Sequence, residues 1–251
     1  MRQDLFGDLF DKEESYWWNV SKREMVLGLA RAAAAANGGR PPIGIDLGCG
    51  AGYTTKVFDD DWRMVGVDIS EDALAFCKNR QLTRLCRVDL TNFALPFKTG
   101  SVDLILALDV IEHVEDDLGA LRECHRILKP GGALVTTVPA FMALWSPWDE
   151  CLGHKRRYTA PELLERLRAA RFTVRRSGYL FFFVFPAAAL VRSVKKIWQR
   201  DAASYSSDFM PLPGFINAAL VRLGEFEKWM MTRWNIRFPF GLSVVAVSVK
   251  Q

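Results

Sequence analysis

The most informative stretch of the sequence, residues 43–53, reads Ile43-Gly44-Ile45-Asp46-Leu47-Gly48-Cys49-Gly50-Ala51-Gly52-Tyr53. Its first part, Ile43–Leu47, has the apolar character and length of a buried strand. Three glycines follow, and residues 53–58 suit a helix. Glycines in such a turn let the backbone approach a ligand, and the helix N-terminus beyond favours a negative group. The stretch predicts a strand–turn–helix unit that holds a small ligand.

Short apolar runs of the same kind recur along the chain, and helical stretches such as Glu71–Arg80 and Leu118–Lys129 separate several of them. Strands that alternate with helices indicate βαβ units and a mostly parallel sheet with right-handed crossovers. We therefore predict an α/β fold, a seven-stranded sheet with helices on both faces. The expected strands are Ile43–Leu47, Arg63–Val67, Leu85–Val88, Val102–Leu108, Ala133–Val138, Phe172–Tyr179 and Leu242–Val249.

Two sequence patterns mark helix starts. Ser21 with Glu24 has the spacing of a capping box, and the helical segment after it is expected to end at Asn37–Gly39. Thr159 with Glu162 has the same spacing and predicts a helix over Ala160–Arg171.

A helical insertion is expected between the last two strands. We divide the chain into a core at 1–179, which includes an N-terminal helical segment, an insertion at 180–241 and a last core strand at 242–251. Within the insertion, Leu180–Val191 is nearly all apolar. It is shorter than the ~20 apolar residues that span a bilayer, so it predicts a buried or interfacial helix. Phe215–Trp234 reads as an amphipathic stretch.

Composition and charge narrow the class of protein. Half of the 251 residues are hydrophobic and 25% are charged, as in an ordinary globular protein. The five cysteines form no paired pattern, and the N-terminus does not read as a secretory signal, so we expect a cytoplasmic location. Between Lys155 and Arg200, twelve basic residues stand against two acidic ones. This excess predicts either an anionic partner or a solvated basic surface.

The spacing of the glycines tests which ligand the turn holds. A dinucleotide-binding turn, G-x-G-x-x-G/A, would carry glycine or alanine where Tyr53 stands. Asp46 places a carboxylate near the turn, which suits a cationic ligand better than a pyrophosphate. The D-x-G-x-G-x-G pattern resembles the first motif of class I S-adenosylmethionine (SAM)-dependent methyltransferases. SAM carries a sulfonium and an ammonium group, and S-adenosylhomocysteine is its product.

The resemblance extends along the chain and implies a Rossmann-like fold. Asp68 ends the second strand, where a carboxylate can accept hydrogen bonds from ribose hydroxyls. Asp89 ends the third strand and matches the acid beside the adenine amino group. Asp103–Val114 resembles the fourth-strand motif, and Leu128–Gly132 the turn into the fifth strand. The resemblance implies these cofactor-binding residues: Arg23, Asp46, Gly48, Cys49, Gly50, Gly52, Asp68, Ile69, Asp89, Leu90, Leu108 and Asp109.

The N-terminal segment Tyr16–Trp18 with Lys22-Arg23 is similar to a W-W-x-x-x-R-R opening of some family members. There the arginine helps to bind the SAM carboxylate, a task that suits its forked donors. The tryptophans are expected to pack the first helix on the sheet. The resemblance covers Ser15–Phe172 and the last strand, and is nearest to the small-molecule branch that includes ubiquinone-pathway O-methyltransferases.

Two histidines are candidates for catalysis. A base is required only if the acceptor loses a proton, as a hydroxyl must. His154 lies in the long loop after the fifth expected strand, in a segment that resembles G-H-x-R-R-Y-T of certain bacterial methyltransferases. It is a candidate base; the alternative is a loop histidine paired with Asp149 or Glu150. His113 follows Glu112 in the E-H element and has a structural role as its alternative.

The acceptor side is less defined. Trp145, Trp148, Arg157 and Tyr158 are the candidate acceptor-binding residues, and we expect no metal. The predicted function is SAM-dependent methylation of a small-molecule or lipid-like acceptor at oxygen, with nitrogen and carbon left open. The alternatives are a non-catalytic protein of the same fold, a nucleic-acid methyltransferase, and, more distantly, a NAD-dependent oxidoreductase.

The insertion is expected to act as an acceptor-site lid that also contacts an anionic membrane surface. Leu180–Val191 offers apolar side chains, and the basic residues Arg192, Lys195, Lys196 and Arg200 follow it, with Trp198 among them. This would place the protein peripherally on the inner face of the membrane. The alternative is a hairpin buried against the sheet or in a homodimer.

Overall fold

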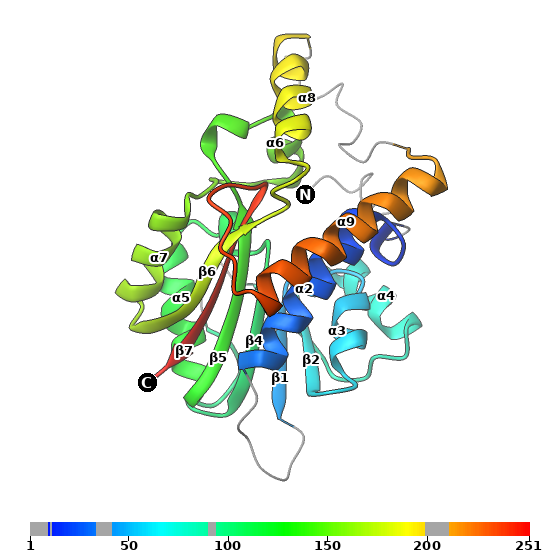
Figure 1. Ribbon diagram of the computed structural model, residues 1–251. Helices are drawn as coiled ribbons and strands as arrows, with labels where there is room; N and C mark the ends of the chain where they lie inside the picture. The colour runs from blue at the N-terminus through cyan, green and yellow to red at the C-terminus, as the bar shows by residue number, and fades with distance from the viewer. Residues whose placement is uncertain (1–9, 11, 34–41, 90–93, 199–210) are drawn as a thin grey trace.

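The computed structural model describes residues 10, 12–33, 42–89, 94–198 and 211–251, with the backbone alone at 193–198 (Figure 1). A single sheet has the strand order β3-β2-β1-β4-β5-β7-β6. All neighbours are parallel except β7, which is antiparallel to both β5 and β6. The strands are β1 Ile43–Leu47, β2 Arg63–Asp68, β3 Leu85–Arg87, β4 Val102–Leu108, β5 Leu128–Pro139, β6 Phe172–Leu180 and β7 Ser243–Lys250.

The predicted seven-stranded, mostly parallel sheet is therefore confirmed. The strand β5 begins earlier than the apolar run alone indicates, because Leu128 already pairs with Val102 ahead of a register shift. The helices are α2 Trp17–Ala33, α3 Tyr53–Phe58, α4 Glu71–Asn79, α5 Asp117–Ile127, α6 Pro147–Leu152, α7 Ala160–Ala169, α8 Phe185–Trp198 and α9 Gly214–Arg233, with short 3-10 helices η3 Ile111–His113 and η4 Met142–Leu144.

Two apolar cores fill the space on the two faces of the sheet. On the strand β4, Ile105 and Ala107 belong to the core under α5 and α7, whereas Leu104 and Leu106 belong to the core under α2 and α9. This division follows from the alternation of side chains along a strand. Figure 1 shows α2 and α9 lying side by side across one face.

The helix starts give one confirmation and one correction. Thr159 and Glu162 form the predicted capping box at the start of α7. The interpretation of Ser21 as a helix cap is wrong, because α2 already begins at Trp17. The side chain of Asn217 on α9 accepts the hydrogen bond of the Trp17 amide, at 2.9 Å. A residue distant in sequence thus accepts the free amide at the start of the helix, and the spacing of nearby residues could not predict this contact. The expected stop at residues 37–39 lies outside the described residues.

The insertion packs into the core of the sheet. Met231 at the end of α9 and Phe238 after it are buried with the side chains of α2. Glu227 of α9 is buried and accepts the amides of Phe181 and Phe182 at 2.6 and 3.0 Å, where the chain leaves β6. Burial raises the pKa of this carboxyl to about 7. In the described parts of the chain, no helix is both long and apolar enough to cross a membrane.

The close approach of α2 and α9 gives a stability prediction. A Cβ atom on Gly224 would lie 2.6 Å from the Cβ of Ser21, whereas one on Gly28 would meet Thr232 at an ordinary 3.7 Å. We expect Gly224→Ala to lower the free energy of unfolding by about 1–3 kcal/mol through overpacking. The control Gly28→Ala should leave it unchanged or raise it by up to about 1 kcal/mol through helix propensity. Urea unfolding measures both, and equal midpoints would contradict the close contact.

Candidate active site

The glycine turn after β1 opens toward the carboxyl ends of the strands. Gly48, Gly50 and Gly52 all have positive φ angles, of 66°, 54° and 82°. A Cβ on Gly48 would lie 2.6 Å from Val110, and one on Gly52 would lie 2.6 Å from Cys77, so the fold excludes side chains at these two positions. A Cβ on Gly50 would meet nothing within 4 Å. The turn therefore leaves open space above Gly50.

Two acids of the sequence motifs hold this turn. Asp68 accepts the amide hydrogen bonds of Gly50 at 3.0 Å and of Ser70 at 2.9 Å, and burial raises the pKa of its carboxyl. Asp46 lies beneath the turn, 2% exposed, and accepts the hydroxyl of Thr55 at 2.6 Å. Burial raises the pKa of Asp46 to about 7. Asp68 thus ties the glycine turn to the end of β2.

Asp109 directly follows Leu108 at the end of β4, the strand that pairs with β1. It has a positive φ of 54°, forms an ion pair with Lys22 of α2 and accepts the hydroxyl of Thr137 at 2.9 Å. Burial opposes ionisation of Asp109, but Lys22 and Thr137 outweigh it and hold the pKa below its usual value. Lys22 was quoted beside Arg23 in the sequence motif, and its pairing with Asp109 was not foreseen.

The N-terminal segment closes over the other side of the turn. The guanidinium groups of Arg23 and Arg80 lie over the ring of Tyr53, at 4.4 and 5.0 Å from its centroid. Arg23 donates to the carbonyl of Glu13 at 3.0 Å, and the carboxylate of Glu13 accepts the amide of Tyr53 at 3.2 Å. The structure therefore brings the predicted Arg23 to the glycine turn, together with two charged residues that the sequence did not single out.

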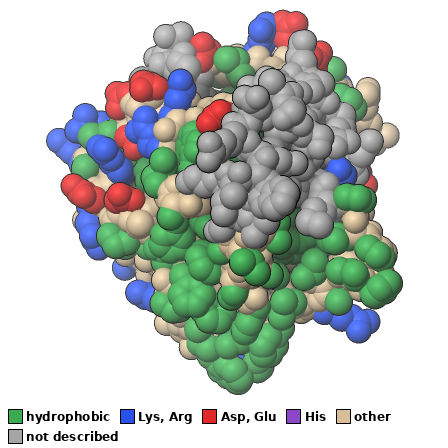
Figure 2. Space-filling view, turned by 90° about the horizontal axis from the view of Figure 1, so that it is seen from above, with side chains coloured by type: hydrophobic (Ala, Val, Ile, Leu, Met, Phe, Trp, Pro, Cys, Tyr) green, Lys and Arg blue, Asp and Glu red, His purple; other side chains and the backbone are tan. Residues whose placement is uncertain are grey.

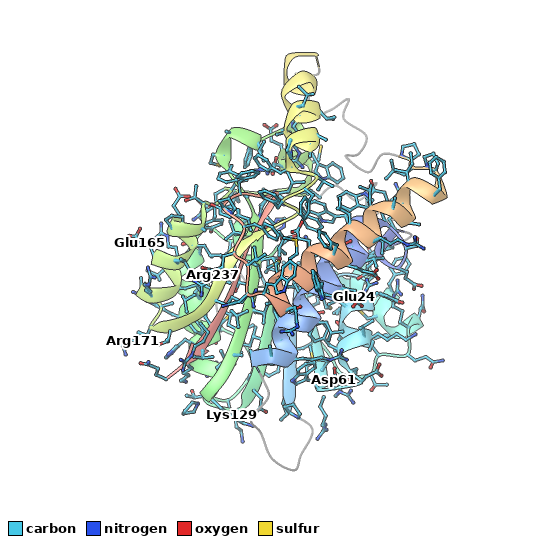
Figure 3. The ribbon with its side chains drawn as sticks, in the orientation of Figure 1. Glu24, Asp61, Lys129, Glu165, Arg171 and Arg237 are labelled. Atoms are coloured by element: carbon cyan, nitrogen blue, oxygen red, sulfur yellow. The ribbon has the colours of Figure 1, made fainter. Side chains whose placement is uncertain are left out.

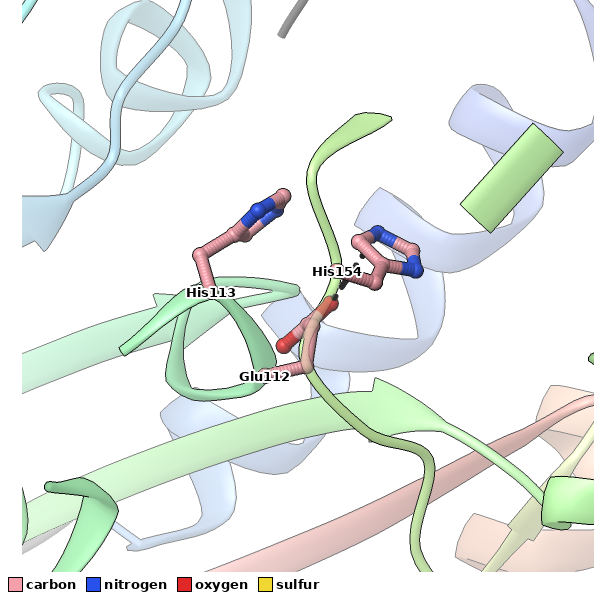
Figure 4. Close-up of side chains that lie close together, drawn as sticks. All are labelled: Glu112, His113 and His154. Atoms are coloured by element: carbon pink, nitrogen blue, oxygen red, sulfur yellow. Dashed lines mark ion pairs between the residues drawn. The ribbon is translucent and has the colours of Figure 1, made fainter. Parts of the chain in front are cut away.

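A second cluster joins η3 to the loop after α6 (Figure 4). Glu112 is fully buried, and neither of its carboxylate oxygens has a hydrogen-bond partner in the described structure, so burial raises its pKa well above the usual value. The Nε2 of His154 lies 3.8 Å from this carboxylate. The ring of His113 meets that of His154 edge-on at 4.7 Å, and burial first, then His154, lowers the pKa of His113 to about 4.

Asp149 orients the ring of His154 through its Nδ1 atom. Its Oδ1 lies 2.8 Å from Nδ1 of His154, which is one of the two partners considered from the sequence. Arg157 binds both oxygens of Asp149, at 2.8 and 2.9 Å, and donates to the carbonyl of Ala140 at 3.0 Å. Burial works against ionisation of Asp149, but His154 and Arg157 hold its pKa well below the usual range. Nδ1 is thus engaged, and Nε2 faces Glu112.

Glu112, His113 and His154 form a group within the described part of the chain that could also hold a metal ion. One ligand atom from each lies within 4.8 Å of the others. Two imidazoles and a carboxylate form a donor set that divalent transition metals accept. The sequence predicts no metal, because its cysteines form no paired pattern.

The candidate acceptor residues lie around the same loop. Trp145 is half-buried and donates to Glu150 at 3.4 Å, and Trp148 is buried. The hydroxyl of Tyr158 donates to Asp117 at 2.9 Å. The donors of Arg157 and Tyr158 thus stabilise the loop, and contact with an acceptor stays a prediction. Among the cofactor candidates, Cys49 is buried beside Cys77, Ile69 is 54% exposed, and Asp89 is exposed just past β3. Leu90 lies outside the described residues.

Known proteins with similar sequences match the part of the chain that carries the motifs. Residues 45–136 match the family described as "Methyltransferase domain". A probable S-adenosylmethionine-dependent methyltransferase of Mycolicibacterium smegmatis is 34% identical over 168 residues, which are 64% of this chain and 61% of that protein. A ubiquinone biosynthesis O-methyltransferase of Pseudomonas aeruginosa is 32% identical over 93 residues, 35% of this chain and 40% of that protein. The chain thus spans under two thirds of each relative's length.

The fold comparison covers more of the molecule. The crystal structure of a SAM-dependent methyltransferase of Thermotoga maritima, described as a possible histamine N-methyltransferase, superposes with a TM-score of 0.57 at 20% identity. The match covers 99% of this chain and 98% of that one. Residues 45–136 therefore match a methyltransferase domain, and the chain as a whole has the Rossmann-like fold of SAM-dependent methyltransferases that the sequence motifs predict.

The buried pair behind His154 gives a prediction. The side chains of Asp149 and Arg157 are 0% and 3% exposed. Arg157→Ala leaves a buried carboxylate without its main partner, so we expect the free energy of unfolding to fall by about 3–5 kcal/mol. Arg31→Ala removes a pair with Asp61 that is 55% and 36% exposed, and should cost less than about 1 kcal/mol. Urea unfolding compares them, and similar losses would contradict the stabilising role of Arg157.

Proposed function

We propose that this chain transfers a methyl group from SAM to a hydroxyl oxygen of a small-molecule or lipid-like acceptor. The observation that carries the proposal is the pairing of His154 with Asp149 in the loop that follows β5. With Nδ1 bound to Asp149, the Nε2 atom of His154 lies 3.8 Å from Glu112, beyond hydrogen-bond distance, and would be the atom that accepts a proton. Methyl transfer to a hydroxyl requires the loss of this proton, whereas positioning supplies much of the remaining acceleration.

For the cofactor, we propose that SAM lies above Gly50. Asp68 would accept the ribose hydroxyls, Ile69 would pack on the adenine and Asp89 would accept the adenine amino group. Arg23, close to the turn, would approach the carboxylate of the methionine moiety. Support comes from the open space at Gly50, the exposed Ile69 and the position of each acid at a strand end.

Asp68→Ala tests the cofactor assignment. The variant loses two charge-assisted hydrogen bonds to the ribose, each worth about 1.5–3 kcal/mol, so SAM affinity should fall at least about tenfold in calorimetry. Asp72→Ala, an exposed acid on α4, is the matched control and should keep wild-type affinity. Heat from NAD binding to the wild type, or unchanged SAM affinity in Asp68→Ala, would refute the assignment.

His154→Ala tests the chemistry. If His154 is the base, turnover should fall by roughly 10²–10⁴ while SAM affinity changes little. His125→Ala, at a histidine on α5, is the control and should keep full activity. Mass spectrometry of products formed from SAM and a host lipid or metabolite extract gives the readout. Wild-type turnover in His154→Ala would leave positioning alone as the source of catalysis.

Aromatic side chains near the end of β5 would suit an apolar acceptor. The ring of Phe141, just past β5, stacks on Tyr179 at 5.1 Å and meets Phe185 of α8 edge-on at 5.8 Å. Arg192 of α8 donates to the carbonyl of Leu144 at 3.2 Å, which ties α8 to this loop. These contacts support α8 as a lid over the acceptor. The side chains of Lys195 and Lys196, expected to contribute to a membrane contact, lie outside the described residues.

A further inference from the structure

Exposed hydrophobic side chains gather on α8, α9 and the segments beside them. They include Phe183, Leu190, Phe215, Phe226, Trp229 and Trp234, which are 38–76% exposed. Figure 2 shows hydrophobic side chains covering one broad side of the molecule, with few charged side chains among them. Large exposed apolar patches with a polar rim mark interaction sites, because a protein rarely leaves them in water.

The helix α9 presents aromatic and basic residues along one outer stripe. Phe215, Arg222, Phe226, Trp229 and Arg233 follow one another by 7, 4, 3 and 4 residues, which places them on one side of a helix, and all are exposed. The opposite side carries the buried residues of the contact with α2. These five residues, with Trp234, are called the outer α9 face below.

The charge around this face is positive. Among the described residues, Arg222, Arg233 and Arg237 have no ion pair, and the exposed acid of α9 is Glu225 alone. Arg237 lies near the C-terminal end of α9 (Figure 3). Burial lowers the pKa of Arg176, and the nearby charge of Arg237 lowers it further. The aromatic side chains are therefore accompanied by cations that the described protein does not neutralise.

A line of ring contacts joins the outer α9 face to the acceptor side of the sheet. Successive rings along this line have centroids 4.3–5.9 Å apart. In order they belong to Phe141, Phe185, Phe240, Phe182, Phe183, Phe226, Trp229 and Trp234. Packed aromatic side chains thus connect the outer α9 face to the end of β5.

We propose that the outer α9 face docks on an anionic lipid bilayer. Tryptophan and phenylalanine side chains would lie at the level of the headgroups, and the arginines would face acidic lipids. The proposed function gives this docking its use, because a lipid-like acceptor resides in the bilayer. The docking itself requires neither SAM nor turnover.

Flotation with vesicles tests the proposal without any cofactor. The wild type should bind vesicles of phosphatidylcholine with phosphatidylglycerol, should not bind phosphatidylcholine alone, and should release as salt shortens the screening length to about 8 Å at 0.15 M. Arg222→Glu with Arg233→Glu should weaken binding about 25-fold or more, because each basic residue contributes roughly fivefold near an anionic surface. Trp229→Ala with Trp234→Ala should weaken it at least about tenfold through lost apolar contact.

Matched controls lie away from this face. Arg168→Glu on α7 and Phe76→Ala on α4 change an exposed arginine and an exposed aromatic, and should keep wild-type binding. Thermal unfolding shows that each variant is folded. Wild type that stays unbound at low salt, or double variants that bind like the controls, would overturn the proposal. A dimer in sedimentation that the tryptophan variant abolishes would also overturn it and assign the face to a second copy. Methyl transfer to a soluble acceptor, measured separately, shows whether the proposed function stands.

Discussion

The chain switches the direction in which its sheet grows between β1 and β4, and the site depends on this switch. The strand β1 pairs in parallel with β2 on one side and with β4 on the other, so the connections after β1 and β4 leave in opposite directions. A crevice opens between them at the carboxyl ends, where open α/β sheets bind ligands. Val110, just past β4, packs so close to Gly48 that no side chain fits there. The glycine turn is thus shaped by the strand beside it as much as by its own sequence.

The buried ionisable groups near this crevice fall into two sets. Asp109 and Asp149 have cationic partners that outweigh burial and hold their pKa values down, whereas the oxygens of Glu112 have no hydrogen-bond partner in the described structure and burial raises its pKa. Burying such groups lowers the free energy of unfolding relative to apolar side chains of similar volume. Neighbouring carboxyl groups whose environments move their pKa values in opposite directions are typical of sites where protons are handled. The opposite pKa shifts agree with the proton transfer proposed for His154.

The sequence predicts features that depend on neighbours in the chain. Strand positions followed from short apolar runs, and the Thr159 cap followed from a spacing of three residues. The contacts that complete the site are long-range. Lys22 pairs with Asp109, and His154 lies beside Glu112. These residues are too far apart in the sequence for a local pattern to predict their contact. Ser21 shows the opposite error: its spacing to Glu24 is that of a cap, but packing against Gly224 and the capping of Trp17 by Asn217 extend the helix past it.

The position of β7 has a consequence for the order in which the molecule can assemble. This strand comes last among the described elements, yet it lies between β5 and β6 and pairs with both along nearly its whole length. During synthesis, β5 and β6 leave the ribosome well before the strand that joins them. Until β7 arrives, two hydrogen-bonding edges stay open beside the apolar surfaces of α8 and α9, the kind of state that recruits other chains. The nascent chain is therefore most exposed to aggregation while the insertion is being made.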